Sequence, residues 1–313
     1  MRNCLTVDVE EWFHVCGVNG ALAFEHWPRL PARVVDNTRD LLDLFARCGV
    51  RGTFFVLGWV AERYPELVAE IQRAGHEIGS HGHLHQRVYE LTPEQFIADL
   101  TASRAALAVA GCEQIIGYRA PEWSINERSL WALDHLVRAG FRYDSSMAPM
   151  RIVGDPNYPQ HAHARSTSAG ELIEFPPLVA RRFGQNMPMG VGWGLRMTAP
   201  ARVLEIIETR NRDGVAVAVA IHPWELDPDP PRVKLPLSKR FAHYFRLAGF
   251  RGRLECILRE GTFAPMGEVL GLGGACQQRQ LLSQHAVDVG AGGRDNGAPA
   301  TAEGTTLPVT ASS

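Results

Sequence analysis

Gly75-His76-Glu77-Ile78-Gly79-Ser80-His81-Gly82-His83-Leu84-His85 is the stretch of this 313-residue chain that says most about its fold and chemistry. Its first part predicts a short strand, and the strand ends in a Gly-flanked turn that carries His81 and His85. Two imidazoles at this spacing can point at one ion from a helical turn or a tight loop. A lone His-x-x-x-His is more often simple surface polarity, so other features decide its meaning.

A second strand that ends in carboxylates lies at Leu5-Thr6-Val7-Asp8-Val9-Glu10-Glu11-Trp12. Asp8 and Glu10 alternate with Val9, so their side chains leave the same face of the strand. Two like charges this close require a bound cation or a shared proton if they are buried. Two histidines and one carboxylate are a ligand set that binds zinc in hydrolases and leaves one coordination position open. We therefore expect Glu10, His81 and His85 to bind a divalent ion, which leaves Asp8 free as a base.

Three more polar residues follow predicted strands. Arg119 ends the strand before Ala120-Pro121-Glu122-Trp123, and a guanidinium there can orient a catalytic carboxylate and keep it ionised. His222 follows the apolar strand 215–221, where it could protonate a leaving amine if Asp144 fixes its tautomer. Each residue taken alone is more often structural. Their common position at the C-terminal ends of strands is what an active site on a βα fold predicts.

Strands and helices alternate along the first 150 residues, which argues for a parallel sheet, either open or closed into a barrel. From about 150 to 197 we expect long loops around one strand, Leu172–Phe175. A helix from Pro200, capped by Thr198, and a final amphipathic helix over Leu237–Leu247 follow, and Leu254–Leu258 either continue that helix or start another. From residue 272 to 313 the composition turns to Gly, Ala, Thr, Ser and Gln, so we predict a disordered low-complexity tail.

The bulk composition limits the class of protein. A formal net charge of −2 with no Lys/Arg block argues against nucleic acid or an anionic membrane as a partner. No apolar run approaches the roughly 18 residues of a membrane span, and the N-terminus shows no signal peptide, so we expect a cytoplasmic protein. The cysteines lack a Cys-x-x-Cys pair and suit reduced thiols; they are Cys4, Cys16, Cys48, Cys112, Cys256 and Cys276.

Together these motifs resemble the polysaccharide deacetylase family, of the NodB-homology or carbohydrate esterase type. The family's acidic motif, His-x-x-x-His motif, Arg-x-Pro motif and late strand-plus-His motif match Thr6–Glu10, His81–His85, Arg119–Pro121 and Ala220–His222. The resemblance spans about residues 3 to 225. It implies a distorted (β/α) barrel of about seven parallel strands, and a catalytic domain over 1–271. The chain resembles one subgroup in the forms of its acidic motif, of His222–Glu225 and of Phe263–Met266. That subgroup has its own C-terminal extension (about 226–271) and is associated with exopolysaccharide production and exosortase-type sorting.

The chain departs from the family pattern at two places. The family commonly has adjacent aspartates, base then metal ligand, whereas Val9 holds the second place here; Glu10 is the expected substitute and Glu11 the alternative. Glu122 replaces the aromatic residue that usually follows Arg-x-Pro, and Trp123 comes one position later. The resemblance places Pro121, Glu122, Trp123 and Trp224 around the substrate.

The resemblance implies a metal-dependent hydrolase, with zinc as the expected ion, that removes N-acetyl groups from amino sugars of a polysaccharide or its lipid-linked precursor. Asp8 would act as base, Arg119 would hold Asp8, and His222 with Asp144 would supply the acid. A backbone N–H near Glu122 would help to stabilise the oxyanion. Two alternatives stay open: a small-amide C–N hydrolase of nitrogen metabolism on the same fold, and a non-catalytic carbohydrate-binding member.

Overall fold

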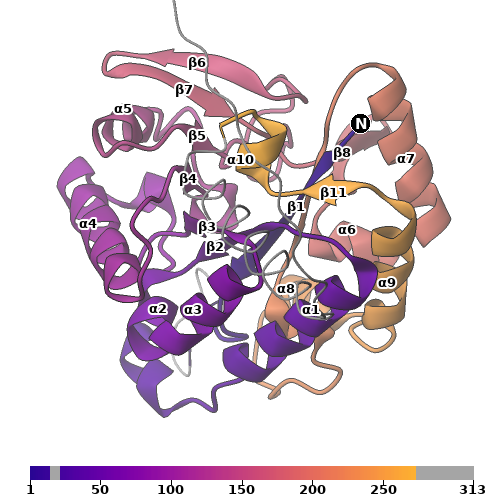
Figure 1. Cartoon of the computed structure of the whole chain (residues 1–313), viewed down its shortest axis with the longest axis horizontal. Helices are drawn as coiled ribbons and strands as arrows, with labels where there is room; N and C mark the ends of the chain where they lie inside the picture. Colours follow the sequence, from indigo (N-terminus) through magenta and orange to yellow (C-terminus); the bar gives the residue numbers. More distant parts are fainter. Residues whose placement is uncertain (15–21, 273–313) are drawn as a thin grey trace, which may run out of the picture. The chain divides into compact units, whose positions relative to one another are not determined.

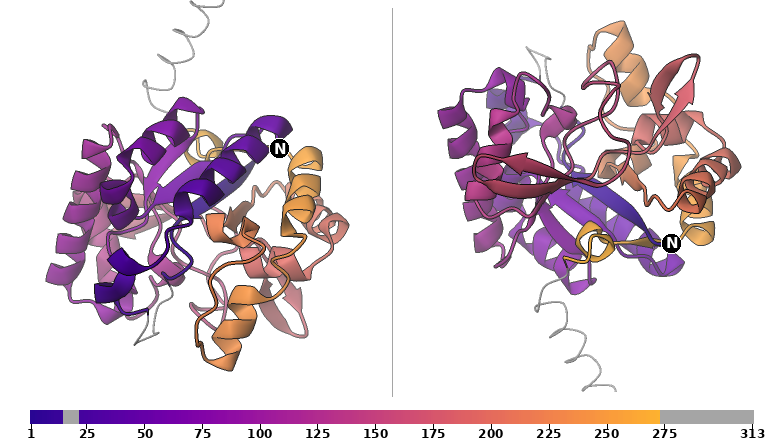
Figure 2. Two further views of the ribbon diagram at one scale, coloured as in Figure 1. Left: turned by 90° about the horizontal axis from the view of Figure 1, so that it is seen from below. Right: turned by 90° about the horizontal axis from the view of Figure 1, so that it is seen from above.

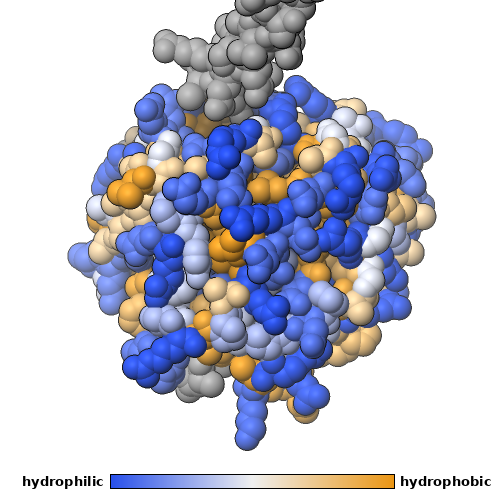
Figure 3. Space-filling view, turned by 60° about the horizontal axis from the view of Figure 1, so that its bottom comes forward, coloured by the Kyte–Doolittle hydropathy of each residue, from blue (hydrophilic) through white to orange (hydrophobic). Residues whose placement is uncertain are grey.

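A computed structural model of the chain describes residues 1–14 and 22–272, and Met1–Leu272 form one compact unit. The predicted tail lies outside the described residues, apart from Leu272. Among the helices in the described part, none is both long and apolar enough to cross a bilayer. Most of the face in Figure 3 is hydrophilic, with apolar side chains at the surface in separate patches, because the large apolar residues fill the core.

The fold is built on one curled, mainly parallel sheet. Its strand order is β10-β1-β2-β3-β4-β5-β7-β6, and β11 pairs with β1. The seven strands from β10 to β7 are parallel, as predicted, and β6 runs antiparallel to β7 at the edge. The strands of this sheet are β1 (Asn3–Val9), β2 (Thr53–Val56), β3 (Glu77–Ser80), β4 (Gly117–Tyr118), β5 (Tyr143–Asp144), β6 (His163–Thr167), β7 (Gly170–Glu174), β10 (Ala218–Ile221) and β11 (Phe263–Ala264).

The sheet curls as part of a barrel, and two single bridges partly cover its open side. The segment after β7 meets β10 through the bridge of Pro177 to Ala218, and a later loop meets it through the bridge of Val191 to Ala220. Between them lies a separate hairpin, β8 (Val179–Arg182) with β9 (Gln185–Pro188). A closed barrel would have a continuous ladder of backbone hydrogen bonds at this position. In the described part of the chain, these two bridges take its place.

Helices cover the outside of the curled sheet. Figures 1 and 2 show α3, α4 and α5 on one side of the central strands and α7 and α9 on the other. The helices are α1 (Val34–Cys48), α2 (Gly58–Arg63), α3 (Pro65–Arg73), α4 (Pro93–Val109), α5 (Trp131–Arg138), α6 (Gly192–Met197), α7 (Pro200–Arg212), α8 (Leu237–Tyr244), α9 (Phe250–Glu260) and α10 (Met266–Val269), with the 3-10 helices η1 (Phe24–Arg29), η2 (Val88–Glu90), η3 (Pro121–Trp123) and η4 (Pro223–Leu226).

Local sequence explains where most of these elements start and stop. Every residue of β1 and of β10 is buried, as expected for strands covered on both faces. The predicted capping box at the start of α4 is confirmed, because Thr92 accepts from the Gln95 backbone and the Gln95 side chain accepts from Thr92 N–H. The predicted Thr198 cap is wrong: α7 begins after Ala199, with no side-chain cap.

The segment from 150 to 197 is more ordered than the sequence predicted. It contains β6, β7, β8, β9 and α6 instead of loops around one strand. β6 reads His163-Ala-Arg-Ser-Thr167, and none of its residues is fully buried. An edge strand and a polar hairpin need no apolar alternation, so periodicity does not reveal them. The helix predicted over Leu237–Leu247 ends at Tyr244, and Leu254–Leu258, predicted to continue it or to start another, lie in the separate helix α9, which α10 follows.

Candidate active site and metal centre

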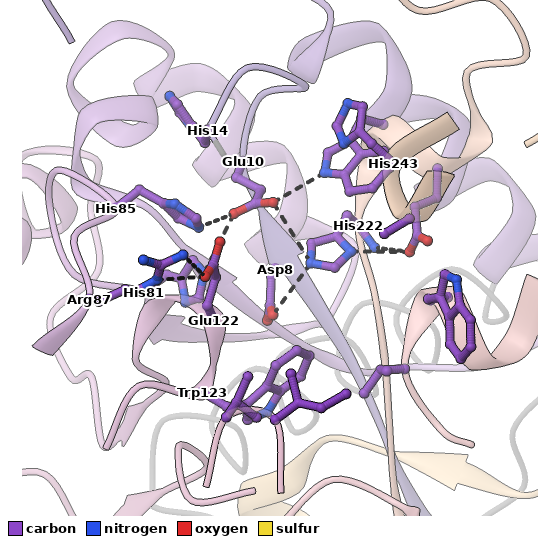
Figure 4. Close-up of a pocket in the computed structure, with 18 of the residues that line it drawn as sticks. Asp8, Glu10, His14, His81, His85, Arg87, Glu122, Trp123, His222 and His243 are labelled. Atoms are coloured by element: carbon purple, nitrogen blue, oxygen red, sulfur yellow. Dashed lines mark hydrogen bonds and ion pairs between the residues drawn. The ribbon is translucent and has the colours of Figure 1, made fainter. Parts of the chain in front are cut away.

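The carboxyl ends of four parallel strands meet at one pocket of about 540 Å³. β1 carries Asp8 and leads to Glu10, and β3 leads to His81, as parallel strands bring their ends to one edge. β4 leads to Arg119, and β10 leads to His222. Figure 4 shows Asp8 and Glu10 between the histidines of the His-x-x-x-His turn and His222. The predicted clustering of these strand-end residues is therefore confirmed.

Glu10, His81 and His85 form the group suited to a metal ion. All three are buried, and their potential ligand atoms lie within 4.8 Å of one another. Glu10 Oε2 is 2.5 Å from His85 Nε2 and 3.7 Å from His81 Nε2. His81 Nδ1 lies 2.8 Å from the Arg119 carbonyl oxygen. A carbonyl only accepts, so Nδ1 carries the proton and Nε2 is left with the lone pair that a metal requires.

The electrostatics of Glu10 also fit a cation. Its Oε2 is buried and faces Nε2 of His85 and of His81. Burial acts to raise the Glu10 pKa, but His85, His222 and His81 outweigh it and hold that pKa well below its usual range. The carboxylate is thus ionised and turned toward two imidazole nitrogens. Two histidines, one carboxylate and room for further ligands match a catalytic zinc site.

Glu11, the alternative ligand, faces the other way. Its Oε1 accepts from the backbone N–H of Arg33 at 2.8 Å and of Val34 at 3.1 Å. These N–H groups belong to the first turn of α1, whose N-cap residue Arg33 supplies no side-chain acceptor of its own. Burial raises the pKa of Glu11 to about 7 against the effect of these hydrogen bonds. Glu11 therefore caps α1 and does not line the pocket, whereas Glu10 does.

Arg119 fixes Asp8, as predicted. Its Nη1 donates to Asp8 Oδ1 and to Thr6 Oγ1, both at 2.8 Å. Its Nη2 donates to Ser145 Oγ at 2.8 Å, and the guanidinium lies 4.4 Å from the Phe55 ring centroid. Arg119 is completely buried and Asp8 nearly so. A buried guanidinium held at this many points gives Asp8 one orientation.

His222 faces Asp8 and Glu10 from the opposite side of the pocket. Its Nε2 lies 3.9 Å from Asp8 Oδ2 and 3.7 Å from Glu10 Oε1 (Figure 4). Its Nδ1 lies 3.1 Å from Glu225 Oε2. Burial lowers the His222 pKa, but Glu10, Glu225 and Asp8 more than reverse that effect and raise it to about 9. The ring is therefore protonated at neutral pH while no cation is bound beside it.

The predicted role of Asp144 is wrong, because Glu225 occupies the position at His222 Nδ1 that was assigned to it. Asp144 instead accepts from Ser146 and shares a buried environment with Glu174. Burial raises the Asp144 pKa to about 6, and burial with the neighbouring Asp144 raises the Glu174 pKa well above its usual range. The sheet order explains the error: β5 and β10 both end at the same edge, but four strands lie between them.

The four predicted substrate residues have different positions. Glu122 and Trp123 line the pocket with positive φ angles of 52° and 50°. Arg87 donates to Glu122 Oε2 at 2.7 Å. Pro121 is buried and does not line the pocket. The oxyanion donor expected near Glu122 stays a prediction.

Trp224 lines the pocket but is nearly buried. Its Nε1 donates to Glu10 Oε1 at 3.1 Å. Its ring stacks on His222 and His243, with centroids 5.1 and 4.3 Å away. Because of these contacts, we interpret Trp224 as a residue that positions Glu10 and His222 rather than as a stacking surface for a sugar ring.

Sequence reasoning missed two buried residues that act on His222, namely Glu225 and Arg196. Glu225 Oε1 lies 2.9 Å from Arg196 Nε, and both side chains are buried. Glu225 had a sequence signal, because it follows His222 by three positions at the start of η4, which is the spacing of a capping box. Arg196 has no comparable signal, since it comes from α6 in the segment predicted as loops.

Comparisons with known proteins divide the chain into two matched regions. Residues 20–143 match the family model described as polysaccharide deacetylase, and residues 145–271 match one described as a domain of unknown function (DUF3473). Residues 20–143 are therefore similar to polysaccharide deacetylases, in the region of the chain that holds the His-x-x-x-His and Arg-x-Pro motifs. The exosortase-associated subgroup is not addressed by these matches.

Curated relatives match parts of the chain. A peptidoglycan deacetylase of Helicobacter pylori is 33% identical over 107 residues, which is 34% of this chain and 36% of that protein. A peptidoglycan-N-acetylglucosamine deacetylase of Bacillus cereus is 29% identical over 120 residues, or 36% of this chain and 40% of that protein. A chitin deacetylase of Arthroderma benhamiae is 37% identical over 82 residues, or 24% and 20%. The chain thus spans two fifths or less of the length of these relatives.

The fold is that of a solved structure from Mycobacterium smegmatis, described as an inferred polysaccharide deacetylase. The two chains superpose with a TM-score of 0.55 at 23% identity, over 96% of each chain. At this identity the likeness concerns the fold alone. The predicted α/β class with a curled, barrel-like parallel sheet is confirmed.

Proposed function

We propose that this chain hydrolyses the acetamide group of N-acetylated amino sugars in a polysaccharide or its precursor, and releases acetate and a free amine. The observation that carries the proposal is one pocket with a metal-ligand group on one side, His222 on the other and the Arg119-held Asp8 between them. The polysaccharide deacetylase match and the names of the curated relatives support the same reaction.

A divalent cation, with zinc as the ion to test first, is part of the proposal. Glu10, His81 and His85 would hold it, and their geometry and the burial of all three side chains support this assignment. When bound, such a cation supplies Lewis acidity, which polarises a carbonyl group and acidifies water.

The side chains of the pocket account for the proton transfers. Asp8, held in place by Arg119, accepts a proton as water attacks the acetyl carbonyl and the C–O bond forms. The C–N bond then breaks, and His222 gives its proton to the departing nitrogen. Acetamide and water thereby become amine and acetic acid, with no further reactant. Proton transfers of this kind contribute roughly 10²–10⁴-fold each.

The experiment is acetate release from oligomers of N-acetylglucosamine by purified protein, measured together with its metal content. We expect acetate to appear in step with free amine, and Asp8→Asn to abolish both while the protein stays folded. Binding of the oligomers without acetate release would contradict the proposal and favour a carbohydrate-binding protein. Activity on small amides alone would move the substrate class to nitrogen metabolism.

The biological setting is also proposed, on the resemblance of the motifs to an exopolysaccharide-associated subgroup. We propose that the amino sugars belong to an exopolysaccharide under synthesis, in lipid-linked or polymer form. Free amino groups in exopolysaccharide from cells with and without an active Asp8 would test it. The cytoplasmic location expected from the sequence stays a prediction.

A further inference from the structure

We infer that the region described as a domain of unknown function is the proton-donating half of the active site, and that its Glu225 and Arg196 are positioning residues for His222. The inference rests on the proposed function, because it assigns residues to the same reaction. It adds a role for residues 145–271, which their family description leaves open.

The two matched regions share one sheet. β1 pairs with β2 from the first region on one side and with β10 from the second region on the other. β11, also from the second region, pairs with β1 as well. His81, His85 and Arg119 come from the first region, whereas His222, Glu225 and Arg196 come from the second. The pocket is therefore incomplete without residues 145–271.

Glu225 holds His222 by two contacts. Its Oε2 accepts from the His222 backbone N–H at 3.1 Å and lies 3.1 Å from His222 Nδ1. An acid that accepts at Nδ1 selects the ring with a proton there and turns Nε2 toward Asp8 and Glu10. The carboxylate is fully buried, and a Cβ at Gly192 would overlap it. The absence of a side chain at Gly192 thus makes room for Glu225.

Arg196 holds Glu225 in turn. Its Nε lies 2.9 Å from Glu225 Oε1. Its remaining nitrogens donate to the carbonyl oxygens of Ala242 at 2.6 Å, His243 at 3.3 Å and Phe245 at 2.6 Å, at the C-terminal end of α8. A buried ion pair is a poor source of stability, but removal of either charge leaves the other one buried and unpaired. The orientation of His222 is thereby tied to α6 and α8 of the second region.

The leaving group distinguishes a positioning role from a merely structural one. An amine departs only when it receives a proton, so amide cleavage depends on a correctly aimed His222. A 4-nitrophenolate departs without one. Loss of Glu225 should therefore slow hydrolysis of an N-acetyl sugar far more than hydrolysis of 4-nitrophenyl acetate. General loosening of the pocket would slow both.

The test compares Glu225→Gln and Arg196→Lys with a control, Glu77→Gln, each in the full-length, metal-loaded protein. Glu77 is half-buried and hydrogen-bonded, to Thr53 and Gly267 N–H, and it does not line the pocket. For Glu225→Gln we expect kcat on an N-acetylglucosamine oligomer to fall on the order of 10²-fold or more, with KM little changed and ester turnover of the same order as the parent. Arg196→Lys should show a smaller change of the same kind, and Glu77→Gln none in the amide-to-ester ratio.

A second readout does not depend on turnover. In the metal-free parent protein, ¹⁵N NMR should show a proton on His222 Nδ1 with a hydrogen-bonded downfield shift, and this shift should be lost in Glu225→Gln. Equal loss of amide and ester turnover in Glu225→Gln would overturn the inference. The absence of an Nδ1–H signal in the parent protein would also overturn it, and that measurement does not require a variant that folds. A parent protein that shows the NMR signal but cleaves only the ester would contradict the proposed function and leave the positioning intact.

Discussion

At the scale of single residues, the direction in which each acidic side chain leaves the backbone after β1 decides which one faces the pocket. Glu10 and Glu11 are adjacent, equally buried and of one chemical type, yet Glu10 faces two imidazoles whereas Glu11 caps α1. Nothing in the residue types distinguishes them. Their side chains leave the backbone in different directions, and this difference distinguishes them.

This difference gives a matched pair of variants for the metal site. We expect Glu10→Gln to bind less than stoichiometric zinc, because a neutral amide is a weak ligand. Glu11→Gln should keep its zinc, because its Oε1 can still accept from the first turn of α1. Metal analysis after dialysis against trace zinc measures both. Metal loss in Glu11→Gln but not in Glu10→Gln would show that the ligand is wrongly assigned.

A second prediction separates the base from the ligands. Asp8→Asn keeps the shape of the side chain and cannot accept the proton, so it should retain metal and lose roughly 10²–10⁴-fold in acetate release. His222→Ala should also retain metal and lose turnover. Asp8→Asn protein that lacks metal, next to metal-containing Glu10→Gln, would mean that the two carboxylates have exchanged roles. A melting curve for each variant shows whether the fold persists.

The sequence predicts those residues of the site that belong to local motifs. His81 and His85 share one turn, Glu10 and Asp8 share one strand, and Arg119 and His222 directly follow strands. Asp144 was assigned to His222 without knowledge of the strand order, which separates β5 from β10. Glu225 was passed over although it lies on the same short segment as His222. The contact of Arg196 with Glu225 depends on the packing of α6, which no local pattern indicates.

At the scale of elements, buried strands and amphipathic helices were predicted and polar strands were not. β1, β2 and β10 are short, apolar and fully buried, and such runs are conspicuous in a sequence. β6 lies at the sheet edge, and the β8–β9 hairpin turns at Phe183 and Gly184, both with positive φ. Their pairing depends on backbone hydrogen bonds and turn geometry, so side-chain periodicity carries little information about them.

The pairing of β5 with β7 places Asp144 beside Glu174, and this gives a prediction about pH. The folded protein raises the pKa of both acids, by burial first, so Glu174 stays protonated where an unfolded chain has lost that proton. The unfolded state then binds fewer protons, and the free energy of unfolding falls as pH rises above about 4.5, the ordinary Glu value.

Glu174→Gln removes that proton equilibrium. The glutamine amide can donate to Asp144 and its oxygen can still accept from Met147 N–H. We expect the variant to lose stability with rising pH less steeply than the parent, by up to about 1.4 kcal/mol per pH unit between pH 5 and 8. Urea unfolding at several pH values measures the difference. Parallel curves would show that Glu174 is ionised in the folded protein.

At the scale of the whole molecule, net charge and composition indicate the class of protein but not the arrangement of its elements. The tail prediction concerns residues outside the described range. Leu272 belongs to the fold, because its N–H donates to the Gly267 carbonyl. We expect removal of residues 273–313 to leave melting temperature and acetate release unchanged, since that composition lacks the apolar surface of a core. Differential scanning fluorimetry with an activity assay tests it. A melting temperature several degrees lower would show that the tail packs on residues 1–272.

The two matched regions lead to the last prediction, because a family boundary at residue 144 cuts through one sheet. A fragment of residues 1–144 would leave β1 without β10 and β11, and β5 without β7. Its central strand β1, buried on every residue, would then become an exposed edge. We expect the fragment to aggregate or to unfold without a cooperative transition, whereas residues 1–272 unfold in one step. A soluble fragment with a sharp urea transition and zinc bound through Glu10, His81 and His85 would contradict this, since the first region would then be an independent domain that docks onto the second.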